Sequence, residues 1–140
     1  MTQLILDTDH VSLLQRNEPL VVKRFNEAVR EDIAITIITV EEQMRGRLSA
    51  IKRAGSSERV ISAYAKLQAT VAVLKKFPII DFDEAAYNCY ASLRRQKIRI
   101  GSQDLRIGAI ALSRNAVVVT RNRRDFGRIP GLLLEDWTIA

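Results

Sequence analysis

The stretch Gln3-Leu4-Ile5-Leu6-Asp7 decides the fold class, because a short apolar run that ends at a charged residue is typical of a buried strand. Two later segments have the same character: Ile33-Ala34-Ile35-Thr36-Ile37 is rich in β-branched residues, and Ala116-Val117-Val118-Val119 is continuously apolar. Briefer strands are predicted at 78–81 and 132–134. Helical patterns separate these segments, so the sequence predicts βαβ units, a mainly parallel sheet and one α/β domain over residues 1–140.

Helices are predicted from the apolar spacing between the strands. One covers Thr8–Gln15, and a second starts near Pro19 and runs through Val29. Thr39 is expected to cap a third helix, with Glu42 at the capping-box spacing. Its apolar stripe ends before Gly55-Ser56-Ser57, and a longer helix follows, which together predict an αα-hairpin. We expect most of the second stripe to be core; it comprises Val60, Tyr64, Leu67, Val71 and Leu74. Further helices are predicted around 86–93 and from Ser102 to Asn115.

The charge of the chain favours a polyanionic partner. The net charge is +6 and the sequence pI is about 9.9. Ten basic residues lie between Arg94 and Arg128, interrupted only by Asp104 and Asp125. Most are arginines, whose planar guanidinium suits phosphate. Nucleic acid or an acidic protein is therefore the expected partner.

Composition also limits the compartment. No apolar run approaches the roughly 20 residues that a bilayer crossing requires, and the first ten residues lack the basic start of a signal peptide. The single cysteine, Cys89, cannot form an internal disulfide and suits a reducing environment. We therefore expect a soluble, cytoplasmic protein without a membrane partner.

Acidic residues fall where a parallel sheet binds ligands, outside the carboxyl ends of its strands. Asp7 directly follows the first strand, and Glu41 and Glu42 open the helix after the second. Asp125 lies just beyond the strand that ends at Val119-Thr120. Asp104 lies in the first turn of a helix that leads into a strand. Four distant segments could thus present carboxylates to one place.

Each acid also has a structural interpretation. Asp7 could cap the following helix, Glu42 could be the capping-box partner of Thr39, and Asp104 could interact with its helix dipole. Asp125 could pair with Arg121 or Arg128 at the surface. As a set, however, carboxylates in close proximity would repel one another and take up protons unless a cation neutralised them.

An all-oxygen site of this kind suits a hard cation, Mg²⁺ or Mn²⁺. Zinc is disfavoured, because one cysteine and the single histidine, His10, cannot supply its usual nitrogen and sulfur ligands. We expect His10 to be a helix or surface residue. A metal beside a basic surface predicts phosphodiester hydrolysis, in which the metal activates water and stabilises the leaving oxygen.

Four segments, in order, resemble the PIN-domain family and within it the VapC-type toxins. They contain Leu4-Ile5-Leu6-Asp7-Thr8-Asp9, then Ile37–Gly46 with Glu42, then Gln103–Ala109 with Asp104, then Val119–Phe126. The likeness covers essentially the whole chain. It implies a three-layer α/β/α sandwich, a divalent-metal ribonuclease acting on RNA, and a cognate antitoxin of a type II toxin–antitoxin system.

The resemblance also implies roles for single residues. Asp7, Glu42 and Asp104 would be metal ligands, with Glu41 a less favoured choice than Glu42. The fourth acidic position departs from the family, because Asn122 stands where some relatives have Asp and Asp125 follows three residues later. Asp125 is our choice for that position, and Thr120, Asn122 and Arg121 are expected to orient water or phosphate. The protruding hairpin would receive the antitoxin and mediate a homodimer.

Two alternatives belong to other classes. Asp7-Thr8-Asp9-His10-Val11 resembles the nucleophile loop of haloacid-dehalogenase-type phosphatases, but the chain has no Asp-Asp pair after a strand, and only Lys97 follows Lys76. A non-catalytic PIN-like domain that binds RNA or protein is the other. A mere binder would gain nothing from acids among bases, which argues against it.

Overall fold

The computed structural model describes residues 2–140 and contains a five-stranded sheet in which every neighbouring pair of strands is parallel. The strands are β1 (Leu4–Leu6), β2 (Ile33–Thr36), β3 (Ile79–Ile80), β4 (Val117–Val119) and β5 (Leu133–Glu135), in the order β3-β2-β1-β4-β5. Central β1 pairs Leu4 with Ile33 of β2 and with Val117 of β4. The predicted parallel α/β fold is confirmed.

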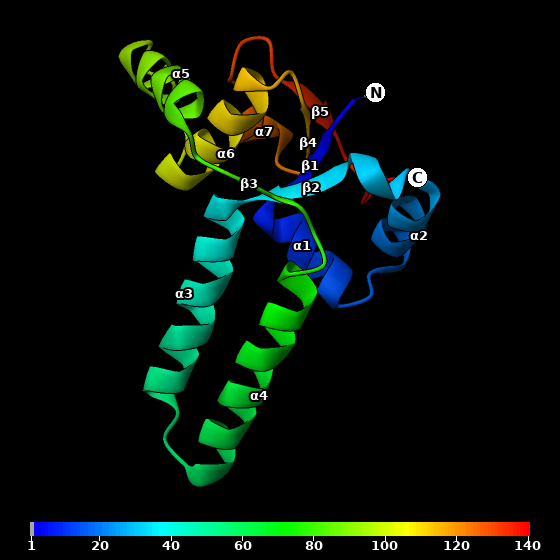
Figure 1. The fold of residues 1–140 in the computed structure, drawn as a ribbon, viewed down its shortest axis with the longest axis vertical. Helices are drawn as coiled ribbons and strands as arrows, with labels where there is room; N and C mark the ends of the chain where they lie inside the picture. Colours follow the sequence, from blue (N-terminus) through cyan, green and yellow to red (C-terminus); the bar gives the residue numbers. More distant parts are fainter. Residues whose placement is uncertain (1) are drawn as a thin grey trace.

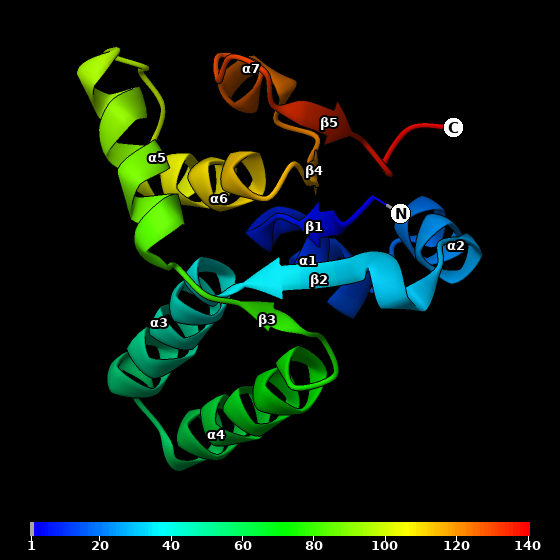
Figure 2. The same ribbon diagram turned by 45° about the horizontal axis from the view of Figure 1, so that its top comes forward.

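Helices cover both faces of this sheet. They are α1 (Thr8–Gln15), α2 (Pro19–Glu27), α3 (Ile37–Arg53), α4 (Ser57–Leu74), α5 (Glu84–Arg95), α6 (Ser102–Ser113) and α7 (Arg123–Phe126), with a 3₁₀ turn at Arg30–Asp32. Figure 1 shows α5, α6 and α7 above the sheet, with α1 and the long α3–α4 hairpin below it. Figure 2, turned by 45°, shows the hairpin projecting away from β3 at one edge of the sheet.

Two cores follow from the alternation of side chains along the strands. Ile5, Ala34 and Val118 point into the core shared with α5 and α6, whereas their neighbours Leu6, Ile35 and Val119 point into the core shared with α1 and α2. The strands are apolar on both faces because helices cover both. This arrangement is the three-layer α/β/α sandwich that the sequence predicted.

The structure corrects several predicted boundaries. The second helix ends at Glu27, before the 3₁₀ turn, and so does not reach Val29. Helix α3 begins at Ile37, earlier than predicted, because the Thr36 hydroxyl accepts the Thr39 backbone N–H and takes the capping position expected of Thr39. The short α7 was not predicted at all.

The expectation that the α4 stripe is mostly core holds only in part. Leu74 is buried, Val60 and Leu67 are partly buried, and Tyr64 and Val71 are exposed by 56% and 45%. The hairpin stands away from the sheet, so only part of each helix has a neighbour to cover it (Figure 1).

Within residues 2–140, no helix has both the length and the apolar character that a membrane span requires.

Candidate active site

A cavity of about 500 Å³ lies beyond the carboxyl ends of the central strands. The chain runs outward from β1 to β2 and β3 and then returns to place β4 on the other side of β1, so β1 and β4 flank the topological switch point of the sheet. The cavity collects residues from four distant segments. It is lined by Asp7, Thr8, Asp9, Glu42, Asp104, Arg121 and Asn122.

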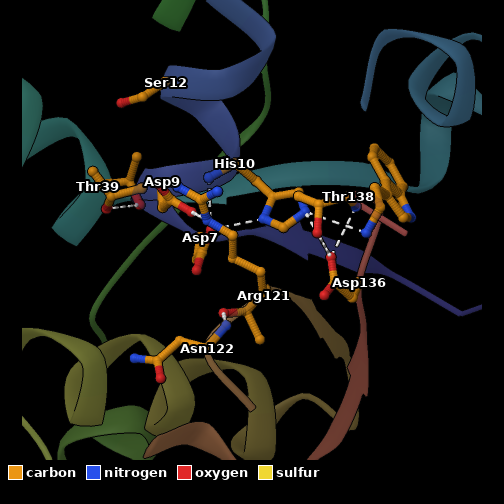
Figure 3. Close-up of polar contacts among 12 residues, drawn as sticks. Asp7, Asp9, His10, Ser12, Thr39, Arg121, Asn122, Asp136 and Thr138 are labelled. Atoms are coloured by element: carbon orange, nitrogen blue, oxygen red, sulfur yellow. Dashed lines mark hydrogen bonds and ion pairs between the residues drawn. The ribbon is translucent and has the colours of Figure 1, made fainter. Parts of the chain in front are cut away.

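Asp7 is held rigidly where β1 passes into α1. Its Oδ1 accepts the backbone N–H of His10 at 2.7 Å, which makes it the N-cap of α1, and lies 3.2 Å from Nδ1 of His10. The backbone N–H of Trp137 donates to Nε2 of His10, so Nδ1 carries the ring proton and donates to Asp7 (Figure 3). Both contacts fall on one oxygen of Asp7, which leaves the other for a ligand.

His10 is therefore neither a surface residue nor free to bind a metal. The structure buries it completely between the start of α1 and the C-terminal segment, where Trp137 is also buried. The expectation that it lies in a helix was right and the surface alternative was wrong. Sequence alone could not show this, because the partner of the imidazole lies 127 residues away along the chain.

Glu42 is positioned by a chain of hydroxyl groups. The Thr8 hydroxyl donates to Oε1 of Glu42 at 2.6 Å, and because it has a single proton, the Thr39 hydroxyl must donate to Thr8 across their 3.0 Å contact. The capping-box interpretation of Thr39 and Glu42 is thereby excluded. Glu41 points elsewhere, since its two oxygens accept from Gln103 and Arg45. The geometry thus favours Glu42 over Glu41.

Asp104 projects from the first turn of α6, which begins after Gly101 without a side-chain cap. Partial burial is the largest cause that raises the pKa of its carboxyl to about 6, followed by the negative charges of Glu42, Asp7 and Asp125. Glu42, Asp7 and Asp125 are thus near enough for their charges to act on Asp104. Among residues 2–140, no side chain donates a hydrogen bond to the Asp104 carboxylate. A bound cation would therefore stabilise the charged form of this acid most.

Asp9 is a site residue that the sequence analysis missed. Its carboxylate accepts from Nε and Nη2 of Arg121 at 2.7 and 3.1 Å, a two-point pair at the wall of the cavity (Figure 3). This pair bridges the start of α1 to the loop after β4. Its only signal in the sequence was its position two residues after Asp7, to which the sequence analysis gave no role.

The loop after β4 holds the remaining predicted residues, of which some line the cavity and others do not. Thr120 is fully buried and its hydroxyl accepts the N–H of Asn122, so it shapes the turn and does not line the cavity. Asn122 lines the cavity and caps α7, and its amide donates to Oδ2 of Asp125 at 3.1 Å. Asp125 is not among the lining residues. Its charge contributes to the raised pKa of Asp104, and its carboxylate accepts from the amide of Asn122.

The donor set fits a hard divalent cation. Asp7, Glu42 and Asp104 offer carboxylate oxygens to one cavity, where burial and then the neighbouring negative charges raise the pKa of Asp104. Asp7, Asp9 and His10 also offer atoms that lie within 4.8 Å of one another. That second grouping is the weaker candidate, because Arg121 occupies Asp9 and both nitrogens of His10 are engaged.

An all-parallel α/β/α sandwich with carboxylates gathered at its switch point defines a class of small α/β domains whose candidate active site is a cluster of acidic residues. The family model described as "PIN domain" matches residues 4–132. The chain belongs to the PIN domain family.

Two curated relatives extend along nearly the whole chain. The Salmonella typhimurium protein named tRNA(fMet)-specific endonuclease VapC is 30% identical over 142 residues, which cover 98% of this chain and 99% of that protein. Ribonuclease VapC1 of Haemophilus influenzae is 32% identical over 137 residues, covering 96% and 97%. These names favour a nuclease over the phosphatase and the non-catalytic alternatives.

Solved structures agree with the fold. DNA-bound VapBC from Salmonella typhimurium matches with a TM-score of 0.79 at 30% identity, covering 98% of this chain and 99% of that one. VapBC-1 from nontypeable Haemophilus influenzae matches with a TM-score of 0.79 at 26% identity, covering 99% and 100%. A toxin–antitoxin complex from Klebsiella pneumoniae, at 24% identity and a TM-score of 0.70, supports the fold alone.

Proposed function

We propose that this chain is a divalent-metal-dependent endoribonuclease that hydrolyses RNA phosphodiester bonds, and that it is the toxin of a toxin–antitoxin pair. The observation that carries the proposal is the meeting of Asp7, Glu42 and Asp104 in one cavity, from segments before β2, after β2 and before β4. The full-length relatives named as ribonucleases and endonucleases support the same activity.

In this proposal Asp7, Glu42 and Asp104 hold Mg²⁺ or Mn²⁺. The bound cation would supply an activated water for in-line attack and stabilise charge on the leaving oxygen. His10 fixes one oxygen of Asp7, and Thr8 fixes one oxygen of Glu42, so that the other oxygen of each carboxylate is left for the cation. We assign Asp125 an electrostatic role on Asp104, in place of the direct ligand role expected from the sequence.

Arg121 and Asn122 also line the cavity and are proposed to meet the substrate. Arg121 is fixed by Asp9 but remains half exposed, so its outer N–H groups can bind a phosphate oxygen. Asn122 can orient water or phosphate through its amide. Thr120 supports them from behind, which replaces the direct contact expected of it.

The hairpin is proposed as the surface for the antitoxin and for a homodimer. Exposed apolar side chains lie along both helices: Leu48 on α3, and Ile61, Tyr64 and Val71 on α4. A largely apolar groove of about 750 Å³ follows Met44, Leu48 and Ile51. Exposed apolar patches of this kind mark protein interfaces. Several of the matched structures are toxin–antitoxin complexes, which supports an antitoxin as one occupant.

A cytoplasmic location stays a prediction.

Incubation of purified protein with single-stranded and structured RNAs, in Mg²⁺, Mn²⁺ or EDTA, tests the proposal. Cleavage is expected only with metal, and Glu42→Gln should abolish it. Glu41→Gln is the matched control. It removes the same charge at the neighbouring residue, whose carboxylate accepts from Arg45 and Gln103. Cleavage that persists in EDTA, or equal loss in both variants, would overturn the metal assignment.

A further inference from the structure

A second charged surface lies on the hairpin, away from the acidic cavity. Two shallow cavities of about 270 and 260 Å³ share Arg47 and Lys66 and form one continuous furrow between α3, α4 and the end of α1. Five cations line it, and no carboxylate does. We call this surface the hairpin groove and define it by Arg16, Arg47, Arg53, Arg59 and Lys66.

These cations have no acidic partners to neutralise them. Within residues 2–140, none of the five forms a salt bridge, whereas Arg24, Arg45 and Arg121 each have a carboxylate within 4.0 Å. Arg47 is oriented by a neutral group, because its Nε donates to the buried hydroxyl of Thr70 at 2.9 Å. The remaining N–H groups of its guanidinium keep their full charge for a ligand.

An unpartnered donor also lies at this furrow. Nε2 of Gln15 is buried and has no hydrogen-bond partner in the described chain, and Gln15 lines the furrow beside Arg16 and Lys66. A buried amide N–H without an acceptor is costly. The furrow therefore has unpaired positive charge beside a buried donor that lacks an acceptor.

The lining chemistry decides between kinds of occupant. Small-molecule pockets are mainly apolar, whereas five cations line this furrow. Between the cations, the tip of the furrow is lined by small residues, Ala50, Ala54, Ser62 and Ala63, which give a peptide side chain no apolar pocket to fill. A chain of phosphates laid across the furrow matches it better.

One face of α3 leads from the acidic cavity to this furrow. Glu42, Gly46, Ser49 and Arg53 follow one another at i, i+4, i+7 and i+11, so they share a stripe of the helix about 16 Å long. The stripe carries only small residues between its ends. A Cβ added at Gly46 would meet nothing within 4 Å, so packing within this chain does not require a glycine there. We call this stripe the α3 track.

We propose that the hairpin groove binds the phosphate backbone of the RNA substrate at a distance from the cleaved bond, with the α3 track as the path between the two sites. That the bound polymer is the substrate rests on the proposed ribonuclease function. Long RNA would then gain affinity from the hairpin that a short oligonucleotide, confined to the acidic cavity, cannot reach.

The test removes three exposed groove cations together, in Arg53→Ala/Arg59→Ala/Lys66→Ala. Its matched control is Lys23→Ala/Lys75→Ala/Lys76→Ala, which also lowers the net charge from +6 to +3 at exposed positions outside the groove. Binding of long RNA is measured in EDTA with Asp104→Asn in each protein, so that nothing is cleaved. Melting temperatures check that all variants fold.

The groove variant is expected to bind long RNA at least about fivefold more weakly, with a salt slope lower by about 2, since each contact to a single strand contributes about 0.7. With Asp104 intact, it should cut a short oligonucleotide at the rate of the unmodified chain and cut long RNA more slowly. The control should match the unmodified chain in both assays.

Equal binding of long RNA by the groove variant and the control would overturn the inference. So would a groove variant that loses affinity only for an acidic peptide. Cleavage of short RNA together with groove-independent binding would leave the ribonuclease proposal intact. Conversely, groove-dependent binding without cleavage of any RNA would support the groove and overturn the ribonuclease proposal.

Discussion

The Thr8 hydroxyl lies 2.6 Å from Oε1 of Glu42 and donates its only proton to that carboxylate. This contact joins the start of α1 to α3, two elements that the sequence separates by the whole of β2 and α2. Thr39, fully buried, supports it from behind. Glu42 therefore reaches the cavity in one fixed orientation, and its second oxygen is the one available to a cation.

Thr8→Val should weaken metal binding while leaving the fold intact. The substitution keeps the branched shape and removes the donor, and loss of such a supporting contact commonly costs 10- to 100-fold in metal affinity. The Mn²⁺ concentration for half-maximal RNA cleavage should rise by about that factor. Thr8→Ser keeps the hydroxyl and is the control. An unchanged metal requirement in Thr8→Val would show that Glu42 needs no such support.

His10→Phe should destabilise the protein by about 1–3 kcal/mol, because it leaves Oδ1 of Asp7 short of one donor and the buried Trp137 N–H without its acceptor. Urea denaturation measures the change in the free energy of unfolding. His10→Asn retains a donor close to the position of Nδ1 and should keep more of the metal affinity than His10→Phe does. If the two variants bind Mn²⁺ equally, the imidazole has no part in orienting Asp7.

Metal should stabilise the fold more at pH 7 than at pH 5. The pKa of Asp104 is raised to about 6, chiefly by burial and then by Glu42, Asp7 and Asp125. The folded state thus holds this proton more tightly than the unfolded chain, so the metal-free fold loses stability as the pH rises from about 4 through 6. A cation replaces the proton and restores it. Melting temperatures measured with and without Mg²⁺ at about 5–10 mM, a concentration that suits weak carboxylate sites, test this difference.

Asp104→Asn provides the control for that experiment. It removes the ionisable group, so the metal-free variant should be more stable than the unmodified chain at pH 7, and the two should converge near pH 4. The shift in melting temperature on adding metal should also shrink. An identical metal-induced shift at pH 5 and pH 7 in the unmodified chain would contradict the role given to Asp104.

The parts of this fold that were predictable depend on local pattern. Apolar runs located β1, β2 and β4, and the rule that ligands bind beyond parallel strand ends indicated where Asp7 and Glu42 would meet. Asp104 was harder, since it precedes its strand; it was included among the candidate acids, and the family likeness then implied its role as a metal ligand. Boundaries failed where a single side chain decides them, as when Thr36 took the capping position expected of Thr39.

The parts that were not predictable depend on contacts between distant segments. The pair of Asp9 with Arg121 spans 112 residues, and the contact of His10 with Trp137 spans 127. No local spacing encodes either one. The position of Asp125 outside the cavity lining was unpredictable for the same reason: it depends on the short α7 and on the Asn122 cap, which only the folded loop reveals.

Substitutions at Gly46 should separate stability from RNA cleavage. Glycine inside a helix costs about 1 kcal/mol relative to alanine, and nothing in this chain packs against the position. Gly46→Ala and Gly46→Gln should therefore both raise the free energy of unfolding, by up to about 1 kcal/mol. Only Gln projects far enough to obstruct the α3 track, so Gly46→Gln should cut long RNA more slowly while Gly46→Ala stays close to the unmodified rate. Equal rates for the two variants would mean that RNA does not pass over Gly46, and the path from Glu42 to Arg53 would then have to be abandoned.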